Sequence, residues 1–330
     1  MSDATSLPLL SVENLSIGFK TEDRGSVRVV EDVSFTVGAG EMVGLVGESG
    51  CGKSVTAMSI LKLLPMPPAF IAGGRVLFGR KDLVTLDDDA MRHLRGEGIG
   101  MIFQEPMTSL NPTFTIGYQL DEVLTTHRAM GAREARARSV ELLRKVGVGA
   151  PESRCNQYPH QLSGGLRQRV MIAMALACGP KLLIADEPTT ALDVTIQAQI
   201  LDLLKRLQEE LGMAVLLITH DLGVVAEFCR RVMVMYAGRI VETAPARCLF
   251  RSPRHPYTAG LLAAVPRLSR GKDRLATIPG MVPPPGTRGV GCPFTDRCPR
   301  VLERCREEMP PLALVEDAGH RAACWNPVPS

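Results

Sequence analysis

The chain has 330 residues, which is long for one compact domain, so we expect one or two. Hydrophobic residues make up 45% and charged residues 22%, a composition that excludes a disordered chain. The 38 basic and 35 acidic residues leave a net charge of +3, which does not predict a nucleic-acid binder. No apolar run approaches the roughly 20 residues that cross a bilayer, so we expect a cytosolic protein. The nine cysteines are an odd number and cannot form a closed set of disulfides.

The N-terminal part predicts strands followed by a helix. Residues 9–19 and 27–37 carry alternating or continuous β-branched and apolar residues, as strands do. Residues 42–46 form a short apolar run bounded by glycines, which indicates a strand buried on both faces. A helix is predicted over 52–64, where prolines end it. Residues 105–177 are mostly helical in pattern, with a stripe of small and apolar residues at Ala132, Ala135, Ser139, Leu142 and Val146.

Strand and helix patterns then alternate. Strands are predicted over 182–185 and 214–219, with a helix over 194–211 between them. Residues 232–242 predict a hairpin that turns at Ala237 and Gly238. This alternation is typical of a parallel sheet covered by helices. From about residue 244 the chain changes to proline, arginine and cysteine with little periodicity.

A phosphate-binding pattern lies between the buried strand and the first helix. Residues 47–54 read GESGCGKS and fit G-x-x-x-x-G-K-[ST]. Glycines let successive backbone N–H groups converge on phosphate oxygens, and the helix start adds its positive dipole end. Lys53 can reach the β- and γ-phosphates, and the Ser54 hydroxyl can bind Mg²⁺. The alternative, an ordinary glycine turn, does not fit the strand and helix on either side.

Further polar residues follow apolar runs. Asp186 would hold Mg²⁺, and Glu187 would polarise the attacking water as a general base. Taken alone, these acids are explained equally well as the surface end of a strand. His220 follows the strand over 214–219 and could contact the γ-phosphate and the water. Gln104 follows the apolar run 99–103, and its amide could reach Mg²⁺ and water.

Residues 162–169 read LSGGLRQR and open another helix. Ser163 is a natural N-cap, and the glycines after it expose N–H groups, which makes a second anion site on one chain. Two phosphate sites far apart in sequence suggest a nucleotide shared between two subunits. This stretch resembles the signature motif of the ABC ATPases, although Leu166 replaces the glutamine common there. The resemblance covers about residues 8–245, with the Walker A loop at 47–54, the Q-loop at Gln104, the Walker B acids at 186–187, the D-loop at Ala191-Leu192-Asp193 and the switch histidine at His220.

The resemblance implies a pair of cassettes that bind ATP and Mg²⁺ head to tail, each ATP lying between one Walker A loop and the other signature. It implies Glu187, His220 and Gln104 as catalytic residues, and Ser54, Gln104 and Asp186 as the Mg²⁺ ligands. Phe19 is the candidate that stacks on adenine, although a core phenylalanine is an equally good explanation. The full set of implied ATP-binding residues is Phe19, Gly47, Ser49, Gly50, Cys51, Gly52, Lys53, Ser54, Val55, Asp186, Gln168 and Asp193, with Ser163, Gly164 and Gly165 acting in trans.

The C-terminal part narrows the resemblance. HPYT at 255–258, IPG at 278–280 and a cysteine cluster are similar to the ATP-binding subunits of oligopeptide, dipeptide and nickel importers. Four thiols close together in a reducing cytosol usually bind metal, although the close C-x₂-C pairs of zinc ribbons are absent. The resemblance implies a [4Fe–4S] cluster, with zinc or no metal as the alternatives. The implied ligands are Cys292, Cys298, Cys305 and Cys324, and the other five cysteines are explained as small buried hydrophobes.

We therefore expect an α/β fold of the P-loop NTPase ABC cassette, with a RecA-like parallel sheet, an antiparallel β subdomain and a helical subdomain. The cassette would span residues 1–245, with the helical subdomain at about 105–178. Residues 246–330 would form a C-terminal extension of the oligopeptide-importer type that carries the four-cysteine cluster.

The function implied is that of the ATP-hydrolysing subunit of a bacterial ABC importer for di- or oligopeptides. It would act peripherally at the cytoplasmic face of the inner membrane. Its partners would be a second ABC ATPase subunit, in a heterodimer or a homodimer, two permease subunits and, indirectly, a substrate-binding protein, without nucleic acid. The alternatives are an importer ATPase for nickel or another small solute and a soluble ABC ATPase of DNA repair or translation. A P-loop kinase or switch GTPase does not explain residues 162–169.

Overall fold

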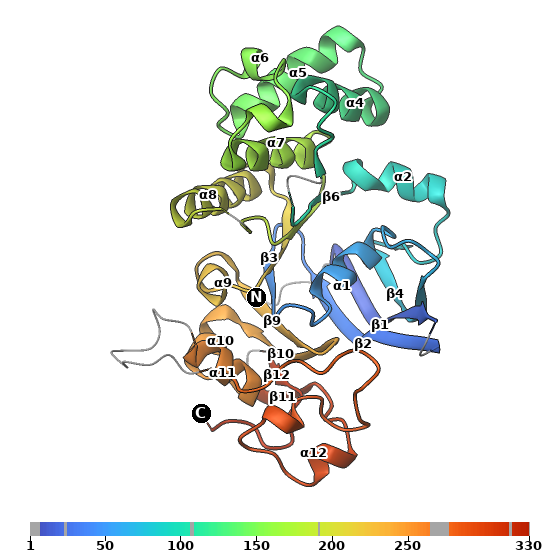
Figure 1. Cartoon of the computed structure of the whole chain (residues 1–330), viewed down its shortest axis with the longest axis vertical. Helices are drawn as coiled ribbons and strands as arrows, with labels where there is room; N and C mark the ends of the chain where they lie inside the picture. Colours follow the sequence, from blue (N-terminus) through green and yellow to red (C-terminus); the bar gives the residue numbers. More distant parts are fainter. Residues whose placement is uncertain are drawn as a thin grey trace. The chain divides into compact units, whose positions relative to one another are not determined.

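The computed structural model describes residues 7–22, 25–105, 109–190, 192–264, 277–316 and 319–329 (Figure 1). The chain forms two compact units. The first takes its residues from within 1–37, 42–85 and 217–330, and the second from within 38–41 and 86–216. The C-terminal extension belongs to the same compact unit as the N-terminal strands, and the predicted domain boundary at residue 245 stays a prediction.

An antiparallel sheet of four strands forms one part of the first unit. β1 (Leu10–Thr21) lies between β2 (Gly25–Val37) and β4 (Ala69–Phe78), and β5 (Lys81–Asp82) pairs with β4 at the edge. The alternating apolar residues of β1 are buried, which confirms the strands predicted over 9–19 and 27–37. β4 was not predicted, because two adjacent glycines interrupt its apolar pattern.

A second set of strands in this unit follows the order β11-β12-β10-β9-β3. β3 (Met42–Val46) runs parallel to β9 (Arg231–Tyr236) and is fully buried, as predicted. β9 and β10 (Arg239–Pro245) form the predicted antiparallel hairpin. The C-terminal extension adds β12 (His320–Ala322) beside β10, and β11 (Ala313–Glu316) beside β12. These last two strands are too short for a periodic pattern to have predicted them.

Helices and short turns complete the first unit (Figure 1). α1 follows β3 and spans Lys53–Ile60, shorter than the predicted helix over 52–64. α9 (Leu222–Phe228) packs on β3, and α10 (Ala246–Arg251) packs on β9 and β10. The remaining elements all belong to the C-terminal extension and are α11 (Pro256–Ala263), η2 (Thr295–Arg297) and α12 (Arg304–Glu307).

The second unit is mainly helical, as predicted. Its strands β6 (Ile99–Ile102) and β7 (Leu182–Asp186) are parallel neighbours. The helices α4, α5 and α7 pack against one another, and α2 and α7 pack on β6. α8 has the predicted bounds. The helical elements are α2 (Asp88–Glu97), α4 (Ile116–Arg128), α5 (Ala132–Lys145), α6 (Pro151–Arg154), η1 (Pro159–Gln161), α7 (Gly164–Leu176) and α8 (Val194–Leu211).

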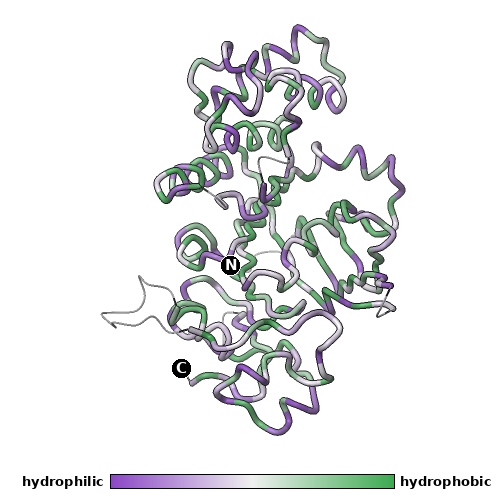
Figure 2. The backbone as a smooth tube through the Cα atoms, in the orientation of Figure 1, coloured by the Kyte–Doolittle hydropathy of each residue, from purple (hydrophilic) through white to green (hydrophobic). Residues whose placement is uncertain are grey.

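Three elements illustrate how the apolar or polar character of a segment relates to its burial. In the stripe predicted for α5, four residues are buried but Ala132 is exposed, because it is the first residue of the helix. α2, which begins with acidic residues, is among the most hydrophilic stretches (Figure 2) and buries Met91. β8 (Ala214–Thr219), whose residues fall in both units, is buried throughout and apolar except for Thr219. Within the described ranges, no helix combines the length and the apolar character that a membrane span requires.

Candidate nucleotide site

The phosphate loop, residues 47–54, joins β3 to α1 in the first unit, in the predicted strand–loop–helix arrangement. Glycine is required by the backbone at two of its positions. A Cβ on Gly47 would collide with the main-chain oxygen of Met235, on the neighbouring strand β9. Gly52 caps α1 with a φ of +108°, where residues with side chains are strained. The glycines therefore bring this loop close to β9 and turn it into the helix.

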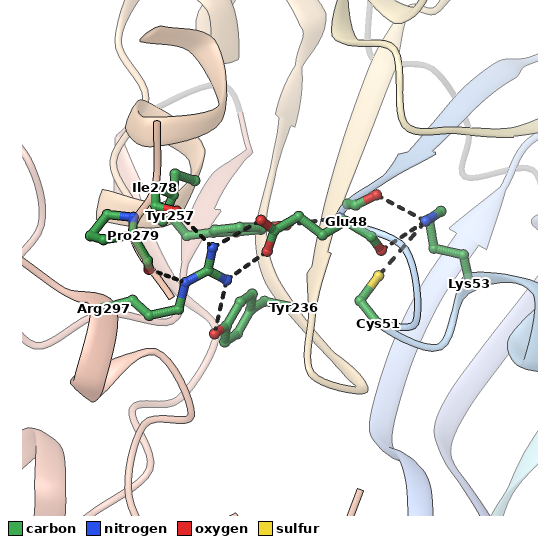
Figure 3. Close-up of polar contacts among 9 residues, drawn as sticks. Glu48, Cys51, Lys53, Tyr236, Tyr257, Ile278, Pro279 and Arg297 are labelled. Atoms are coloured by element: carbon green, nitrogen blue, oxygen red, sulfur yellow. Dashed lines mark hydrogen bonds and ion pairs between the residues drawn. The ribbon is translucent and has the colours of Figure 1, made fainter. Parts of the chain in front are cut away.

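Lys53 and Cys51 are both buried within the loop, and Lys53 Nζ lies 4.0 Å from Cys51 Sγ. The side chain of Lys53 is buried, and its Nζ donates to the carbonyl oxygens of Gly47 at 2.9 Å and Glu48 at 3.0 Å (Figure 3). Burial raises the pKa of the Cys51 thiol, against the lowering effect of Lys53. Cys51 is thus a neutral buried side chain, and a ligand at this position would meet its backbone and not its sulfur.

The helix α1 supplies anion-binding groups. Thr56 N–H donates to the Gly52 carbonyl at 2.9 Å, which is the first hydrogen bond within the helix. The N–H groups before it, including those of Ser54 and Val55, precede the hydrogen-bonded turns of the helix. Ser49 and Gly50 are exposed at the tip of the loop. The N–H groups at the helix start, the helix dipole and a buried lysine together form a site suited to phosphate.

The acidic residues lie in the second unit, at the end of β7. Asp186 is the buried last residue of that strand, and Glu187 follows with a φ of +45°, an uncommon value for a residue with a side chain. Gln104 Nε2 donates to Glu187 Oε2 at 3.1 Å, and Thr190 Oγ1 donates to the same oxygen at 2.9 Å. Two of the residues predicted as catalytic, Gln104 and Glu187, are therefore in direct contact. Ser54, the third predicted Mg²⁺ ligand beside Gln104 and Asp186, belongs to the first unit.

The signature motif begins α7 in the second unit. Ser163 is the predicted N-cap, since its Oγ accepts a hydrogen bond from Leu166 N–H at 3.4 Å, and the residue is exposed. A Cβ on Gly165 would press on Ile196 of α8, so the helix start lies close against that helix. Gln168, unlike the exposed Ser163, is buried in the second unit, with 1% of its surface exposed. Its predicted role toward nucleotide stays a prediction.

The other predicted residues have mixed positions. Asp193 is exposed, and its Oδ1 accepts from Ile196 N–H at 2.9 Å, which caps α8. Ala191 of the predicted D-loop lies outside the described residues. His220 is exposed directly after β8, in the first unit. Phe19 is half-buried on β1, also in the first unit, where its backbone pairs with Val27 and Ala69.

The four cysteines of the extension have similar surroundings. Cys298 Sγ accepts from Arg300 N–H at 3.4 Å, and Cys305 Sγ from Leu302 N–H at 3.5 Å. Cys292 and Cys324 also accept backbone N–H groups, and Cys292 lies within electrostatic reach of the other three. Burial raises the pKa of Cys292 and of Cys324 to about 11 each, so without a metal these thiols stay protonated. In the described part of the chain, no group of three or more His, Cys, Asp or Glu side chains is arranged to hold a metal ion.

The remaining cysteines do not form a further site. Burial raises the pKa of Cys229 to about 12. Four of the five are buried, as predicted for small hydrophobes, and Cys248 is half-buried. The buried four are Cys51, Cys155, Cys178 and Cys229.

Two residues that contact the phosphate loop were not predicted. Tyr257 Oη accepts a hydrogen bond from Glu48 N–H at 2.9 Å, and Arg297 pairs with the Glu48 carboxylate at 2.6 Å (Figure 3). Tyr257 lies in the HPYT stretch, which supports the family resemblance but did not predict a physical role for Tyr257. Arg297 precedes Cys298, and nothing in its local pattern pointed to the loop.

Comparisons with known proteins agree with this arrangement. Residues 30–190 match the family described as ABC transporter, and residues 241–305 match the family described as oligopeptide/dipeptide transporter, C-terminal region. The oligopeptide transport ATP-binding protein OppD of Bacillus subtilis is 52% identical over 96% of this chain and 88% of its own length. The dipeptide transport ATP-binding protein DppD of Escherichia coli is 49% identical over 98% of each chain. The dimeric ATP-binding cassette MJ0796 bound to ADP and Pi superposes with a TM-score of 0.64 and 32% identity, over 72% of this chain and 99% of that one.

The phosphate loop after a buried strand, together with the capped LSGG helix start, defines an ATP-binding cassette of the P-loop NTPase fold. Such cassettes are the ATPases of ABC transporters. This chain belongs to the oligopeptide/dipeptide transporter family of ABC transporter ATP-binding proteins.

Proposed function

We propose that this ATPase powers the import of di- or oligopeptides. The observation that carries the proposal is the match of residues 241–305 to the C-terminal region of oligopeptide/dipeptide transporters, joined to full-length relatives that are named for peptide transport. It would act with two membrane permease subunits at the cytoplasmic face of the inner membrane, fed by a substrate-binding protein. No nucleic acid takes part.

Purification of the tagged chain in mild detergent tests this assignment. We expect two hydrophobic permease subunits and a second ABC ATPase to co-purify, and we expect peptide loaded on the binding protein to stimulate ATP hydrolysis by that assembly. Stimulation by nickel and not by peptide would reassign the transported solute. Recovery with ribosomes or DNA would contradict the importer function.

The phosphates of ATP would lie on the N–H groups of the loop, with Lys53 at the β- and γ-phosphates. Ser54, Asp186 and Gln104 supply a hydroxyl, a carboxylate and an amide oxygen, and hard oxygen donors of this kind fit Mg²⁺. Bound Mg²⁺ would neutralise phosphate charge. The loop, Lys53 and these donors would orient the γ-phosphate, and Phe19 would stack on adenine.

Glu187 would act as the general base. The contacts of Glu187 Oε2 with Gln104 at 3.1 Å and Thr190 at 2.9 Å hold the carboxylate in one orientation. A carboxylate held in this way can take a proton from an attacking water, and His220 would contact the γ-phosphate.

Substitution Glu187→Gln tests the base. We expect ATP turnover to fall by about 10²- to 10⁴-fold, while ATP binding is retained. The Thr190→Val variant is the matched comparison, because it removes one hydrogen bond to the same oxygen and leaves the carboxylate. Its turnover should fall by less than tenfold or so. Full turnover by Glu187→Gln would exclude the assigned role.

Ser163, Gly164 and Gly165 would bind the ATP of a second cassette. Support comes from the exposed position of Ser163 at a helix start and from the dimeric cassette that this chain resembles. A related subunit is the partner we propose in preference to a second copy. Analysis of the purified chain with ATP by light scattering decides between these, since a homodimer would form without other proteins.

We further propose that Cys292, Cys298, Cys305 and Cys324 hold a [4Fe–4S] cluster. The N–H groups that point at the sulfurs suit bound thiolates. When bound, the cluster would cross-link the extension and could carry an electron.

Absorption spectroscopy and iron analysis of anaerobically purified protein test the cluster. We expect a brown protein with about four irons per chain. Stoichiometric zinc would assign a zinc site to these cysteines in place of the cluster. A colourless chain without metal would contradict any metal site there.

A further inference from the structure

The C-terminal extension contacts the phosphate loop at Glu48 (Figure 3). Arg297 Nη1 donates to Glu48 Oε2 at 2.6 Å, and Arg297 Nη2 donates to Glu48 Oε1 at 2.9 Å. The pair is bidentate, which fixes direction as well as distance. Tyr257 Oη accepts from Glu48 N–H at 2.9 Å, so both the side chain and the backbone of Glu48 are held.

Arg297 is itself fixed by the extension and by β9. Its Nε donates to the Pro279 carbonyl at 2.8 Å, and Nη1 lies 3.4 Å from Tyr236 Oη. The Arg297 side chain is 5% exposed, against 31% for Glu48. Hydrogen bonds to Glu48 raise the pKa of Arg297, and its planar fork is held before any ligand arrives.

Tyr257 is held by aromatic packing. Its ring centroid lies 4.6 Å from that of Tyr236 and 5.4 Å from that of Phe294, and all three rings are buried. His255 caps α11 and accepts from Tyr257 N–H at 3.1 Å. Burial raises the pKa of the Tyr257 hydroxyl, so it stays neutral beside the loop.

Three groups of Glu48, its N–H, its carboxylate and its carbonyl, determine how the loop is held. Its N–H and its carboxylate point to the extension, and its carbonyl accepts from Lys53 Nζ at 3.0 Å. On the other side, Gly238 N–H donates to the Cys51 carbonyl at 2.7 Å. The loop is therefore held between the extension, at Glu48, and the β9–β10 turn, at Cys51, and Glu48 also aligns Lys53.

We propose that Arg297 and Tyr257 are positioning residues through which the C-terminal extension holds the phosphate loop in its nucleotide-binding conformation and sets the affinity for ATP. Arg297 also neutralises a carboxylate beside the phosphate site, where an unpaired negative charge would repel ATP. The inference rests on ATP binding by this loop and needs no metal at the cysteines.

Titration of the purified chain with a fluorescent ATP analogue, together with steady-state ATPase kinetics of the assembly that co-purifies with it, tests the proposal. We expect Arg297→Gln to raise Kd and KM for ATP about 10- to 100-fold, because the loop is displaced and Glu48 is left charged and unpaired. The kcat at saturating ATP should stay within about twofold, since bound ATP restores the loop. The double variant Glu48→Gln/Arg297→Gln should recover only the affinity that the repelling charge costs, and the loss caused by displacement of the loop should remain.

Arg300→Gln is the matched control. Arg300 lies in the same segment but bonds Asn326 at 3.0 Å and does not touch the loop. Its affinity for ATP should equal that of the unaltered chain. Tyr257→Phe keeps the buried ring and removes the hydroxyl alone, so it should fold and bind ATP about three- to tenfold more weakly.

The outcomes separate the proposals. Unaltered affinity in both Arg297→Gln and Tyr257→Phe, with lost affinity in Lys53→Met, overturns the positioning role and leaves the loop as the nucleotide site. Equal losses in Arg297→Gln and Arg300→Gln also overturn it, because general damage to the extension would explain both. Absence of ATP binding by the unaltered chain would contradict the nucleotide site itself. If Arg297→Gln does not fold by circular dichroism, Tyr257→Phe decides alone.

Discussion

We propose a ligand both for the phosphate loop and for the cysteine segment, residues 292–324, but the two regions use different parts of the chain. The loop presents backbone N–H groups from consecutive residues between β3 and α1. The cysteine segment presents four side-chain sulfurs, and η2, α12 and two short strands carry the chain between them. In the loop, glycine conformation, one lysine and the contacts of Glu48 with the extension determine the geometry. In the cysteine segment, each sulfur depends on how distant stretches pack.

This difference predicts whether a substitution in each region changes ligand binding or stability. A change of a loop side chain should reduce ligand binding and leave folding intact, because the backbone provides the structure. A change in the cysteine segment should reduce stability first. Its effect on ATP would pass through Arg297, the neighbour of Cys298, which contacts Glu48.

Replacement of Lys53 by methionine should give the largest effect on binding. The substitution keeps the buried aliphatic stem and removes the ammonium that would meet the phosphates. We expect ATP affinity to fall by about 100-fold or more, with little change in the unfolding midpoint. Fluorescent nucleotide titration and thermal unfolding measure the two quantities. A large loss of stability in this variant would remove the contrast between the loop and the cysteine segment.

Gly47→Ala should depart from the pattern expected for the loop and reduce stability, because it changes the backbone and not a binding group. The new Cβ would collide with the Met235 carbonyl, so we expect a loss of about 3 kcal/mol in unfolding free energy. Gly50→Ala is the control, because its Cβ would meet open space at a φ of +77°, and it should cost about 1 kcal/mol. Urea unfolding compares them. Equal losses would show that φ and not the close approach to β9 is decisive.

Cys305→Ser tests the cysteine segment, where we expect a substitution to reduce stability. Cys305 is buried, and its carbonyl also accepts from Cys292 N–H at 2.7 Å, so the residue joins two parts of the segment. We expect a loss of about 2 kcal/mol in unfolding free energy of the metal-free chain, because a buried hydroxyl lacks the packing of the thiol. Cys248→Ser, outside the segment and half-buried, should change stability by less than about 0.5 kcal/mol. Stability measurements that rank the two variants in the opposite order would contradict a structural role for the cysteine.

The smallest expected effect is a pH dependence at His255, the N-cap of α11. Burial lowers the pKa of His255 to about 4, against the raising effect of Glu242. The unfolded chain binds a proton near pH 6.5 and the folded chain does not, so stability falls as the pH drops from 6.5 toward 4. Between pH 7 and 5.5 we expect His255 to account for a loss of about 1 kcal/mol.

The His255→Asn variant measures this contribution. Asparagine can still cap α11 and has no proton to bind, so its stability should fall less steeply over that pH range. Glu242 and His320, which pair at 2.7 Å nearby, are common to both chains and cancel in the comparison. Identical slopes in urea unfolding at pH 7 and 5.5 would assign the dependence to other groups.

The sequence allowed the loop to be predicted because its chemistry is local. The buried strand Met42–Val46, the glycines and Lys53 are adjacent, and one short pattern contains them all. The hairpin turning at Ala237 and Gly238 was predicted for the same reason. The contact of Arg297 with Glu48 spans 249 positions, and no spacing rule connects residues that far apart.

Other differences have equally physical causes. β11 and β12 form because the extension returns to the edge of β10, which is a tertiary effect and not a propensity. The exposure of Ala132 follows from its place at the first turn of α5, where the predicted stripe has not yet turned inward. The contact between Gln104 and Glu187 could be anticipated from their motifs, but the third member, Thr190, could not.

The ring packing of Tyr236 has a practical consequence for truncated chains. Tyr236 on β9 is fully buried, and Tyr257 and Phe294 of the extension cover it. A chain ended at residue 245 would expose this ring and leave the edge of β10 without its partner β12. Exposed aromatic surface beside an open strand edge promotes aggregation. The cassette and its extension should therefore be expressed together, since the solubility of the first depends on the presence of the second.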